Sequence, residues 1–407
     1  MAGAVRTAGW GWGRVRVPAD VGALCLVILL ADILAGIVAP TFSLHARHLG
    51  ISLGALGALG ALSGIVQLAA SIPFGILSDR VGRPIMMVAG MACFGLGLLC
   101  FALAQGLPLL ILGRLFFGLA PVATFQIGTA QLGDITVPGQ RSFAFGLYAT
   151  AMGLGFTIGP LIGGQLAERA GTPTAYLVGA VIALIGVVLT LRTVHPAEPK
   201  GARAAGARGL RGIAAILGRA DIALVCLGNL LITWTFAGAV STFFPLYGAT
   251  LGLTAATLGS FFALRAFVSA LGRLPNALIV RAFGNRAVLF AALAIEAAIM
   301  FALGHVSAPT LLALLLACEG LAYGAYLVAG QAYIADQSTP ENRGTATGLY
   351  GMAASLGGVA APAALGVLAT RAGLPAVFTA TAWLLVVGLL AIALVGVWTG
   401  RAARVRA

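Results

Sequence analysis

Five ionisable residues stand within long apolar stretches of this 407-residue chain: Asp32, Arg114, Arg265, Glu296 and Glu319. A charge in an apolar helix costs about 3 kcal/mol on membrane-insertion scales, so each of the five is a candidate for function. A buried carboxylate can carry a proton, because burial disfavours its charged form and a neighbouring cation favours it. A ligand that breaks a carboxylate–arginine pair would therefore change how firmly the proton is held.

The elements that must position these residues are membrane-spanning helices. The chain is 60% hydrophobic and 9% charged, whereas soluble domains contain about 25% charged residues. Hydropathy predicts about twelve spans of about 20 to 25 residues, long enough to cross a bilayer. We place them at 21–44, 52–77, 84–105, 107–131, 142–167, 174–193, 221–247, 254–280, 286–305, 308–334, 344–370 and 374–398. The predicted fold class is an all-α membrane protein.

The second half of the chain repeats the first at an offset of 202 residues. Pro73 is matched by Pro275, and Asp134 by Asp336. Conformationally special residues and loop charges at a constant spacing indicate two copies of one unit. Duplicated membrane halves are typical of secondary transporters, with the pathway between the halves. The predicted units are a six-helix bundle over 1–193, a cytoplasmic linker over 194–220 and a second six-helix bundle over 221–407.

The net charge of +13 sets topology and does not indicate nucleic acid. Most lysines and arginines fall on one side of the predicted spans, and only Arg47, Arg169 and Arg371 fall in loops on the other side. By the positive-inside rule, both termini are cytoplasmic. The expected location is the cytoplasmic membrane of a bacterium, where basic residues contact anionic lipids. The five cysteines lie in apolar spans, and neither a metal site nor a cofactor is predicted.

The loop Gly75–Pro84 reads GILSDRVGRP. Gly82 permits a tight turn, and Asp79 can cap a helix N-terminus. The loop resembles the loop signature of the major facilitator superfamily. This resemblance implies a cytoplasmic gate in which Asp79 contacts the eleventh span near Arg343, while Asp134 pairs with one of the loop arginines. The predicted gate residues are Gly75, Asp79, Arg80, Gly82, Arg83 and Asp134.

The fourth and fifth spans carry two further patterns of the same family. Arg114 resembles the family's fourth-helix arginine, although the second copy has Leu316 there, so the fold does not require this charge. The glycines of the fifth span resemble the signature of the drug–proton antiporter branch. Such residues soften a helix and permit close contact, so the resemblance implies a hinge between the halves. The hinge residues are Gly146, Gly155, Gly159, Pro160, Gly163 and Gly164.

The first, fourth, seventh and tenth helices line the cavity in this family. The resemblance therefore implies that Asp32, Arg114 and Glu319 face the cavity and couple transport to protons. Asp32 and Arg114 are expected at compatible depths, with Asp32 as the principal proton site or as part of a structural ion pair. Glu319 either serves a substrate or proton role or pairs with Arg265. Glu296, on the usually peripheral ninth helix, would pair with Arg265 or extend to the membrane surface.

Aromatic residues cluster on the helices expected to line the cavity in the second half. Walls of this kind suit lipophilic or cationic compounds, although each aromatic could equally face lipid or a neighbouring helix. The candidate cavity residues are Trp234, Phe236, Asn229, Tyr323, Tyr326 and Arg265.

The resemblance implies proton-coupled efflux of small lipophilic or cationic compounds by alternating access. The alternative is a facilitator or proton symporter for a small polar solute, such as a sugar or organic acid. An enzyme is not predicted, since the single lysine, Lys200, forms no Walker loop and no nucleophile elbow is present. The expected partners are a small-molecule substrate, protons and membrane lipids, and the expected state is a monomer.

Overall fold

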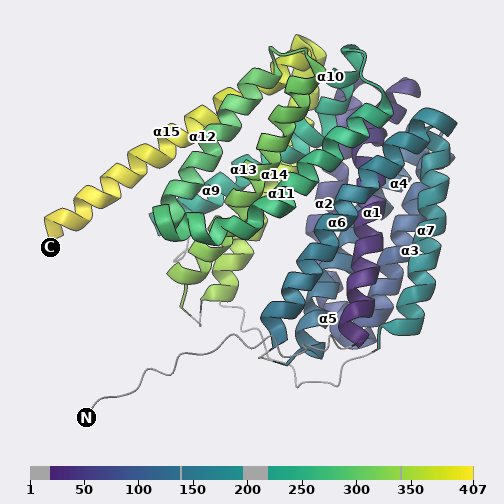
Figure 1. Cartoon of the computed structure of the whole chain (residues 1–407), viewed down its shortest axis with the longest axis horizontal. Coiled ribbons are helices and arrows are strands. Elements are labelled where there is room, and N and C mark those ends of the chain that lie inside the picture. Colours follow the sequence, from purple (N-terminus) through teal and green to yellow (C-terminus); the bar gives the residue numbers. More distant parts are fainter. Residues whose placement is uncertain (1–18, 138–139, 196–218, 340–341, 407) are drawn as a thin grey trace.

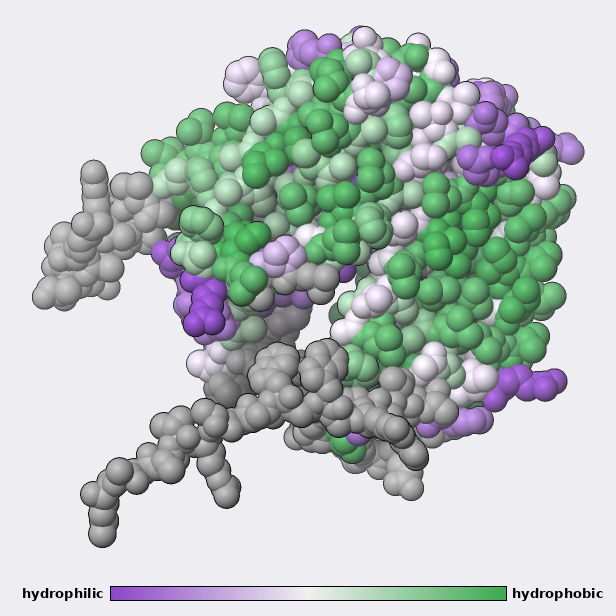
Figure 2. All heavy atoms as spheres, in the orientation of Figure 1, coloured by the Kyte–Doolittle hydropathy of each residue, from purple (hydrophilic) through white to green (hydrophobic). Residues whose placement is uncertain are grey.

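The computed structural model describes residues 19–137, 140–195, 219–339 and 342–406. Within these residues, twelve helices are long and apolar enough to cross a membrane, which confirms the predicted number and the all-α class. Hydrophobic side chains cover the middle of the surface, and hydrophilic ones gather toward its two ends (Figure 2). This distribution suits a protein whose flanks face lipid.

Six spans precede the predicted linker. They comprise α1 (Ala19–His48), α2 (Leu53–Val81), α3 (Arg83–Ala102), a fourth span built from α4 (Leu107–Pro121), η1 (Val122–Gln126) and α5 (Ile127–Ile135), then α6 (Arg141–Ala170) and α7 (Thr172–Thr193).

Six more spans follow it. They comprise a seventh span built from α9 (Ala220–Trp234), η3 (Thr235–Phe243) and α10 (Phe244–Thr250), then α11 (Ala255–Phe283), α12 (Asn285–Leu303), α13 (Pro309–Gln337), α14 (Arg343–Ala372) and α15 (Leu374–Arg406).

The fourth and seventh spans contain π-helical segments, η1 and η3, that the sequence did not predict. Segment η1 follows Pro121, which has no N–H to donate to the preceding turn. Short π-helical segments are frequent at functional sites. Both of these segments lie in spans that reach the central cavity described below.

The helices form two groups that lie side by side (Figure 1). The α1–α7 group and the α9–α15 group meet mainly where α6 packs on α11 and where α2 packs on α14. The end of the molecule at which α10 lies is called the α10 end, and the opposite one the α5 end. The predicted division at 194–220 falls mostly outside the described residues and stays a prediction.

Glycine and proline make the two helix crossings between the groups possible. A Cβ added to Gly164 would lie 3.0 Å from Gly259 Cα, and one added to Gly366 would lie 3.0 Å from Gly57 Cα. Gly57 and Gly259 are separated by the same 202 residues as the rest of the repeat. The two crossings are therefore copies of one another, as duplicated halves require.

The groups are joined at the α10 end and separated at the α5 end. Ser43 Oγ on α1 donates a hydrogen bond of 2.7 Å to the Thr242 carbonyl on η3. The Ala256 N–H donates one of 2.8 Å to Glu168 Oε2. Figure 2 shows the surface hollowed between the groups, toward the α5 end. The described chain thus encloses a cavity that is closed at its α10 end.

Candidate functional site

The central cavity has a volume of about 430 Å³ and lies between the two helix groups. Its walls come from α1, α2, α4 and α6 of one group and from η3, α13 and α14 of the other. Aromatic side chains form much of the lining: Phe42, Phe117, Phe156, Phe236 and Tyr323. A cavity of this size with apolar walls and a few polar groups is typical of sites for small molecules.

Arg114 is the one charged residue among the described residues that line the cavity. Its Cζ lies 3.5 Å from the ring centroid of Phe42 and 5.9 Å from that of Phe101. Its Nε is buried and has no hydrogen-bond partner among the described residues. No ion pair joins Arg114 to Asp32 in the described part of the chain, so a pair between them is not formed.

Asp32 is buried at the crossing of α1 and α6, set back from the cavity lining. It is 6% exposed, and a Cβ added to Gly155 would lie 2.7 Å from its Cβ. Its Oδ2 has no hydrogen-bond partner among the described residues. Arg273 of α11, in the other helix group, is near enough to act on its charge, although no ion pair joins the two among the described residues. The expected cavity position of Asp32 is corrected: Ala35, Val38 and Phe42 of α1 line the cavity, and Asp32 lies on the face of α1 that packs on α6.

Arg265 and Glu319 form a buried ion pair between α11 and α13. Both nitrogens Nε and Nη2 of Arg265 donate to the carboxylate, the second at 2.8 Å. The guanidinium Cζ lies 4.1 Å from the ring centroid of Phe236 and 5.1 Å from that of Tyr323. Since both aromatics line the cavity, the ion pair lies directly behind its wall. Arg265 and Glu319 themselves are not lining residues.

Glu296 is fully buried beside this pair. Its side chain faces inward because α12 packs on α13, so of the two expectations it lies near Arg265 and does not extend to the membrane surface. Both of its carboxylate oxygens lack a hydrogen-bond partner among the described residues. It interacts electrostatically with Glu319 and Arg265. Two acids and one arginine thus share an apolar site, and its charge balances when one carboxyl group holds a proton.

The first copy of the repeat has no charge at these positions. Subtracting 202 from Glu296 and Glu319 gives Phe94 and Phe117. Their ring centroids lie 5.2 Å apart in an edge-to-face contact, which is a favourable aromatic geometry. The same junction can therefore be packed without ionisable groups. The replacement of both acids by phenylalanine in the first copy is visible in the sequence, and the sequence analysis did not use it.

Three other predicted cavity residues lie off the cavity. Asn229 Nδ2 donates to the Tyr350 carbonyl at 2.8 Å, so it joins helices. Trp234 is partly buried, and its Nε1 has no partner among the described residues. Tyr326 is buried and donates to the Val225 carbonyl at 2.9 Å. These corrections follow from which face of each helix the neighbouring helices cover.

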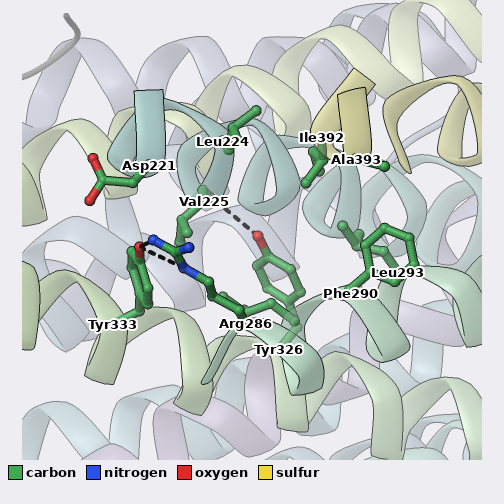
Figure 3. A pocket seen from close by; sticks show the side chains of 11 residues that line it. Asp221, Leu224, Val225, Arg286, Phe290, Leu293, Tyr326, Tyr333, Ile392 and Ala393 are labelled. Atoms are coloured by element: carbon green, nitrogen blue, oxygen red, sulfur yellow. Dashed lines mark hydrogen bonds between the residues drawn. The ribbon is translucent and has the colours of Figure 1, made fainter. Parts of the chain in front are cut away.

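Tyr326 instead borders a second cavity of about 170 Å³ within the α9–α15 group. Figure 3 shows Tyr326 and Tyr333 on one side of it and Leu293 and Phe290 on another. Arg286 closes one end, with Nη2 donating to the Tyr333 hydroxyl at 3.0 Å. This cavity lies outside the central pathway.

The predicted gate loop lies at the α5 end. Arg83 Nε lies 2.8 Å from Asp134 Oδ2, so Arg83 makes the ion pair expected between Asp134 and a loop arginine. Gly82 has φ of 96°, as a tight turn at this position requires. Asp79 is 71% exposed and lies 3.7 Å from Arg83. No hydrogen bond or ion pair joins Asp79 to α14 among the described residues, so the expected latch is not engaged here.

The predicted hinge residues of α6 divide between two neighbours. Gly155, Gly159 and Gly163 face α1 of the same group, where an added Cβ at each would clash with backbone. Gly164 instead contacts α11 of the other group, and Pro160 contacts both, with its ring toward Gly36 of α1 and its carbonyl toward Gly259 of α11. Gly146 has open space around it. Of the six residues expected to form a hinge between the halves, Pro160 and Gly164 therefore reach the other group, because residues four apart share one helix face and Gly164 lies on another.

Comparison with known proteins agrees with this architecture. The profile described as Major Facilitator Superfamily matches residues 24–264 and again 227–406. The chain belongs to the Major Facilitator Superfamily. This membership makes it a membrane transporter and not an enzyme.

Several curated members of the superfamily are similar over part of this chain. Inner membrane transport protein YajR of Escherichia coli is 28% identical over 46% of this chain and 38% of its own length. Multidrug resistance protein 1 of Bacillus subtilis is 30% identical over 41% of this chain and 44% of its own length. Quinolone resistance protein NorA of Staphylococcus aureus is 26% identical over 36% of this chain and 37% of its own length. The chain thus matches less than half the length of each of these relatives.

Solved structures of the superfamily share the fold. A bacterial homologue of the human lysosomal transporter Spinster superposes with a TM-score of 0.78, at 16% identity, covering 92% of this chain and 95% of that one. The nucleoside transporter NupG superposes with a TM-score of 0.76 at 16% identity, and the match covers 92% of this chain and 98% of NupG.

Proposed function

We propose that this transporter expels small lipophilic compounds across the cytoplasmic membrane in exchange for protons, by alternating access. The observation that carries the proposal is the buried cluster of Arg265, Glu319 and Glu296 directly behind Phe236 and Tyr323 of the cavity wall. A substrate that moves these aromatics also moves the surroundings of the cluster. Proton binding and substrate binding are thereby linked through one wall.

The closure at the α10 end supports the assignment of this conformation as cytoplasm-open. The loop arginines Arg80 and Arg83 lie at the α5 end, and the positive-inside rule assigns such loops to the cytoplasm. A compound then enters from the cytoplasm or inner leaflet. The outward-open state requires the Ser43–Thr242 contact to break. Rigid-body rocking about repeated helix crossings is the usual route.

Asp32 supports coupling between conformation and proton binding. It belongs to the first helix group, whereas Arg273, with which it interacts, belongs to the second. Rocking of the groups changes the separation of these two side chains. Because a nearby cation favours a charged carboxylate, this change alters how firmly Asp32 holds a proton. Asp32 and Glu319 are therefore the proposed proton carriers.

The names of the relatives support efflux. Two of them are called multidrug and quinolone resistance proteins. Their similarity is stronger support for lipophilic cargo than composition is, since composition only shows the membrane class. Cationic cargo is not part of the proposal, because the one charge on the described lining is that of Arg114. The expected monomeric state stays a prediction.

The alternative function, movement of a polar solute such as an organic acid, is favoured by Arg114 alone. Sugar recognition would need several converging hydrogen-bond groups in the lining, and most of this lining is aromatic or aliphatic. Measurement of substrate-evoked proton release distinguishes an exchanger from a facilitator.

The test uses purified protein in a weakly buffered solution with a pH-sensitive dye. Compounds that protect an efflux-deficient bacterium expressing the transporter are added, and proton release is recorded. We expect release from the wild type. Arg265→Gln alone should lower stability by about 3–5 kcal/mol, because it leaves buried carboxylates without a cation.

The double variant Arg265→Gln with Glu319→Gln separates a structural pair from a proton carrier. Removal of both charges should restore folding, and proton release should remain lost. Full proton release from the folded double variant would contradict the role of Glu319. No release from the wild type with any protective compound would contradict proton exchange altogether.

A further inference from the structure

We propose that the central cavity binds amphipathic organic anions, with the anionic group against Arg114 and an aromatic or aliphatic body between the aromatic walls. The inference rests on the proposed function, in that it takes this cavity as the transport pathway and names the class of its occupant.

The positive charge of Arg114 has no carboxylate partner among the described residues. The guanidinium lines a cavity at membrane depth, and no ion pair in the described part of the chain involves it. Burial of a charge is costly without a counter-charge. Its protein contacts are the faces of Phe42 and Phe101, which provide weaker compensation than a carboxylate does. An anionic ligand would supply the missing partner.

The three acids within the spans lie away from the lining of the central cavity and therefore do not balance the charge of Arg114. Glu319 is bound by Arg265, and Glu296 lies beside that pair. Asp32 faces α6 and interacts with Arg273. None of the three is a described lining residue of the cavity. A cationic ligand would therefore meet a like charge in the cavity without an acid to offset it.

Aromatic side chains form much of the remaining wall. Phe117 lines the cavity one helical turn from Arg114, and Phe156, Phe236 and Tyr323 line it from the other side. Ser63 also lines it, and its hydroxyl donates to the Arg114 carbonyl at 3.1 Å. One fixed cation beside a broad aromatic surface matches a compound with one anionic group and an apolar ring. The volume of about 430 Å³ is sufficient for such a molecule.

The second copy of the repeat shows which substitution of Arg114 the fold should accept. The position of Arg114 corresponds to Leu316, which is fully buried in the second copy. Arg114→Leu should therefore fold, since the same helix junction accepts leucine there. Arg114→Lys keeps the charge but loses the planar fork that binds carboxylates in two places. Arg169→Gln, in the last turn of α6 at the α10 end, serves as a control that also removes one positive charge.

The experiment measures binding of three naphthyl probes that differ in charge to the purified transporter in nanodiscs of phosphatidylcholine, without any ion gradient. The probes are 1-naphthoate, the neutral 1-naphthamide and the cationic 1-naphthylmethylammonium. We expect naphthoate to bind roughly 10- to 100-fold more tightly than the amide, since hydrogen bonds to charged groups are the stronger ones. The ammonium should bind most weakly. Arg114→Leu should abolish the preference for naphthoate, Arg114→Lys should retain part of it, and Arg169→Gln should retain all of it.

Each other result overturns the inference. Equal binding of the three probes, tighter binding of the ammonium, or no binding of naphthoate would show that the cavity does not select anions. The ranking in the wild type decides the question even if a variant fails to fold. Because the assay has no gradient, failure of proton exchange would leave this ranking unchanged, and the two proposals fail separately.

Discussion

At the scale of single residues, the chain contains an internal comparison for its own charges. The cluster of Arg265, Glu296 and Glu319 occupies a junction that Phe94 and Phe117 fill in the other copy. An aromatic contact is stable without a desolvation cost, whereas a buried ion pair often stabilises a protein no more than apolar residues do. The charges are thus better explained by function than by stability.

Substitution of Asp32 tests whether this residue carries the exchanged proton. Asp32→Asn removes a titratable group but keeps the size of the side chain that faces Gly155. We expect the variant to fold and to lose efflux driven by a pH gradient, by more than about tenfold, because the exchange of a proton is removed. The measurement is efflux from proteoliposomes with an imposed gradient. Asp20→Asn, on an exposed position of the same helix, is the matched control. Unchanged efflux by Asp32→Asn would remove Asp32 from the mechanism.

At the scale of elements, the glycines of α6 determine how closely its neighbours approach. In the second copy, Ala361 and Leu365 replace two of these glycines and contact Gly238 of η3. The seventh span is π-helical at this position, whereas α1 remains α-helical opposite the all-glycine face. The two copies of one crossing therefore differ in helix geometry where their side chains differ in size.

Gly164 and Gly146 give a matched pair of substitutions on α6. Gly164→Leu places a side chain where the Ala255 carbonyl oxygen of α11 lies 2.5 Å from the added Cβ, and Gly146→Leu places it in open space. We expect Gly164→Leu to lower stability by about 2–4 kcal/mol through overpacking between the groups. Gly146→Leu should change stability by less than about 0.5 kcal/mol. Thermal unfolding followed by size-exclusion chromatography in detergent measures both. Equal effects would contradict the assignment of Gly164 to the crossing.

At the scale of the whole molecule, alternating access follows from where the groups touch. The glycine crossings and the Ser43–Thr242 contact lie toward the α10 end, and the hollow lies toward the α5 end (Figure 2). Asp79 is exposed at that open end. A contact between Asp79 and the N-terminus of α14 would form only when the groups meet there.

Substitution of Asp79 tests whether this residue stabilises the state in which the two helix groups meet at the α5 end. A carboxylate at a helix N-terminus contributes about 0.3–1 kcal/mol, so its loss should raise the ratio of cytoplasm-open to outward-open molecules by roughly two- to fivefold. The measurement is labelling of a cysteine introduced at Ser355, a lining residue, by a reagent added from the cytoplasmic side in a background without the native cysteines. Arg169→Gln, at the opposite end, should leave the labelling rate unchanged. An unchanged rate in Asp79→Asn would argue against the latch.

The class, the number of spans and the duplication can be predicted from the order of the amino acids alone. These features depend on local hydropathy and on residues such as Gly82 whose backbone role is fixed by their own chemistry. The ion pair of Asp134 with a loop arginine was also predictable, because the two loops had to meet at one membrane surface. The buried acids could be found by sequence, since a charge in an apolar span is conspicuous.

Which of those charges meet depends on how the helices pack. Pairing depends on the rotation of each helix about its axis, and a rotation of one residue turns a side chain by about 100°. For this reason Arg265 meets Glu319 rather than remaining separate, Asp32 faces α6 without an ion pair to Arg114, and Glu296 faces the interior. Hydropathy in an all-apolar helix does not specify that rotation, because the lipid and the protein interior are equally apolar.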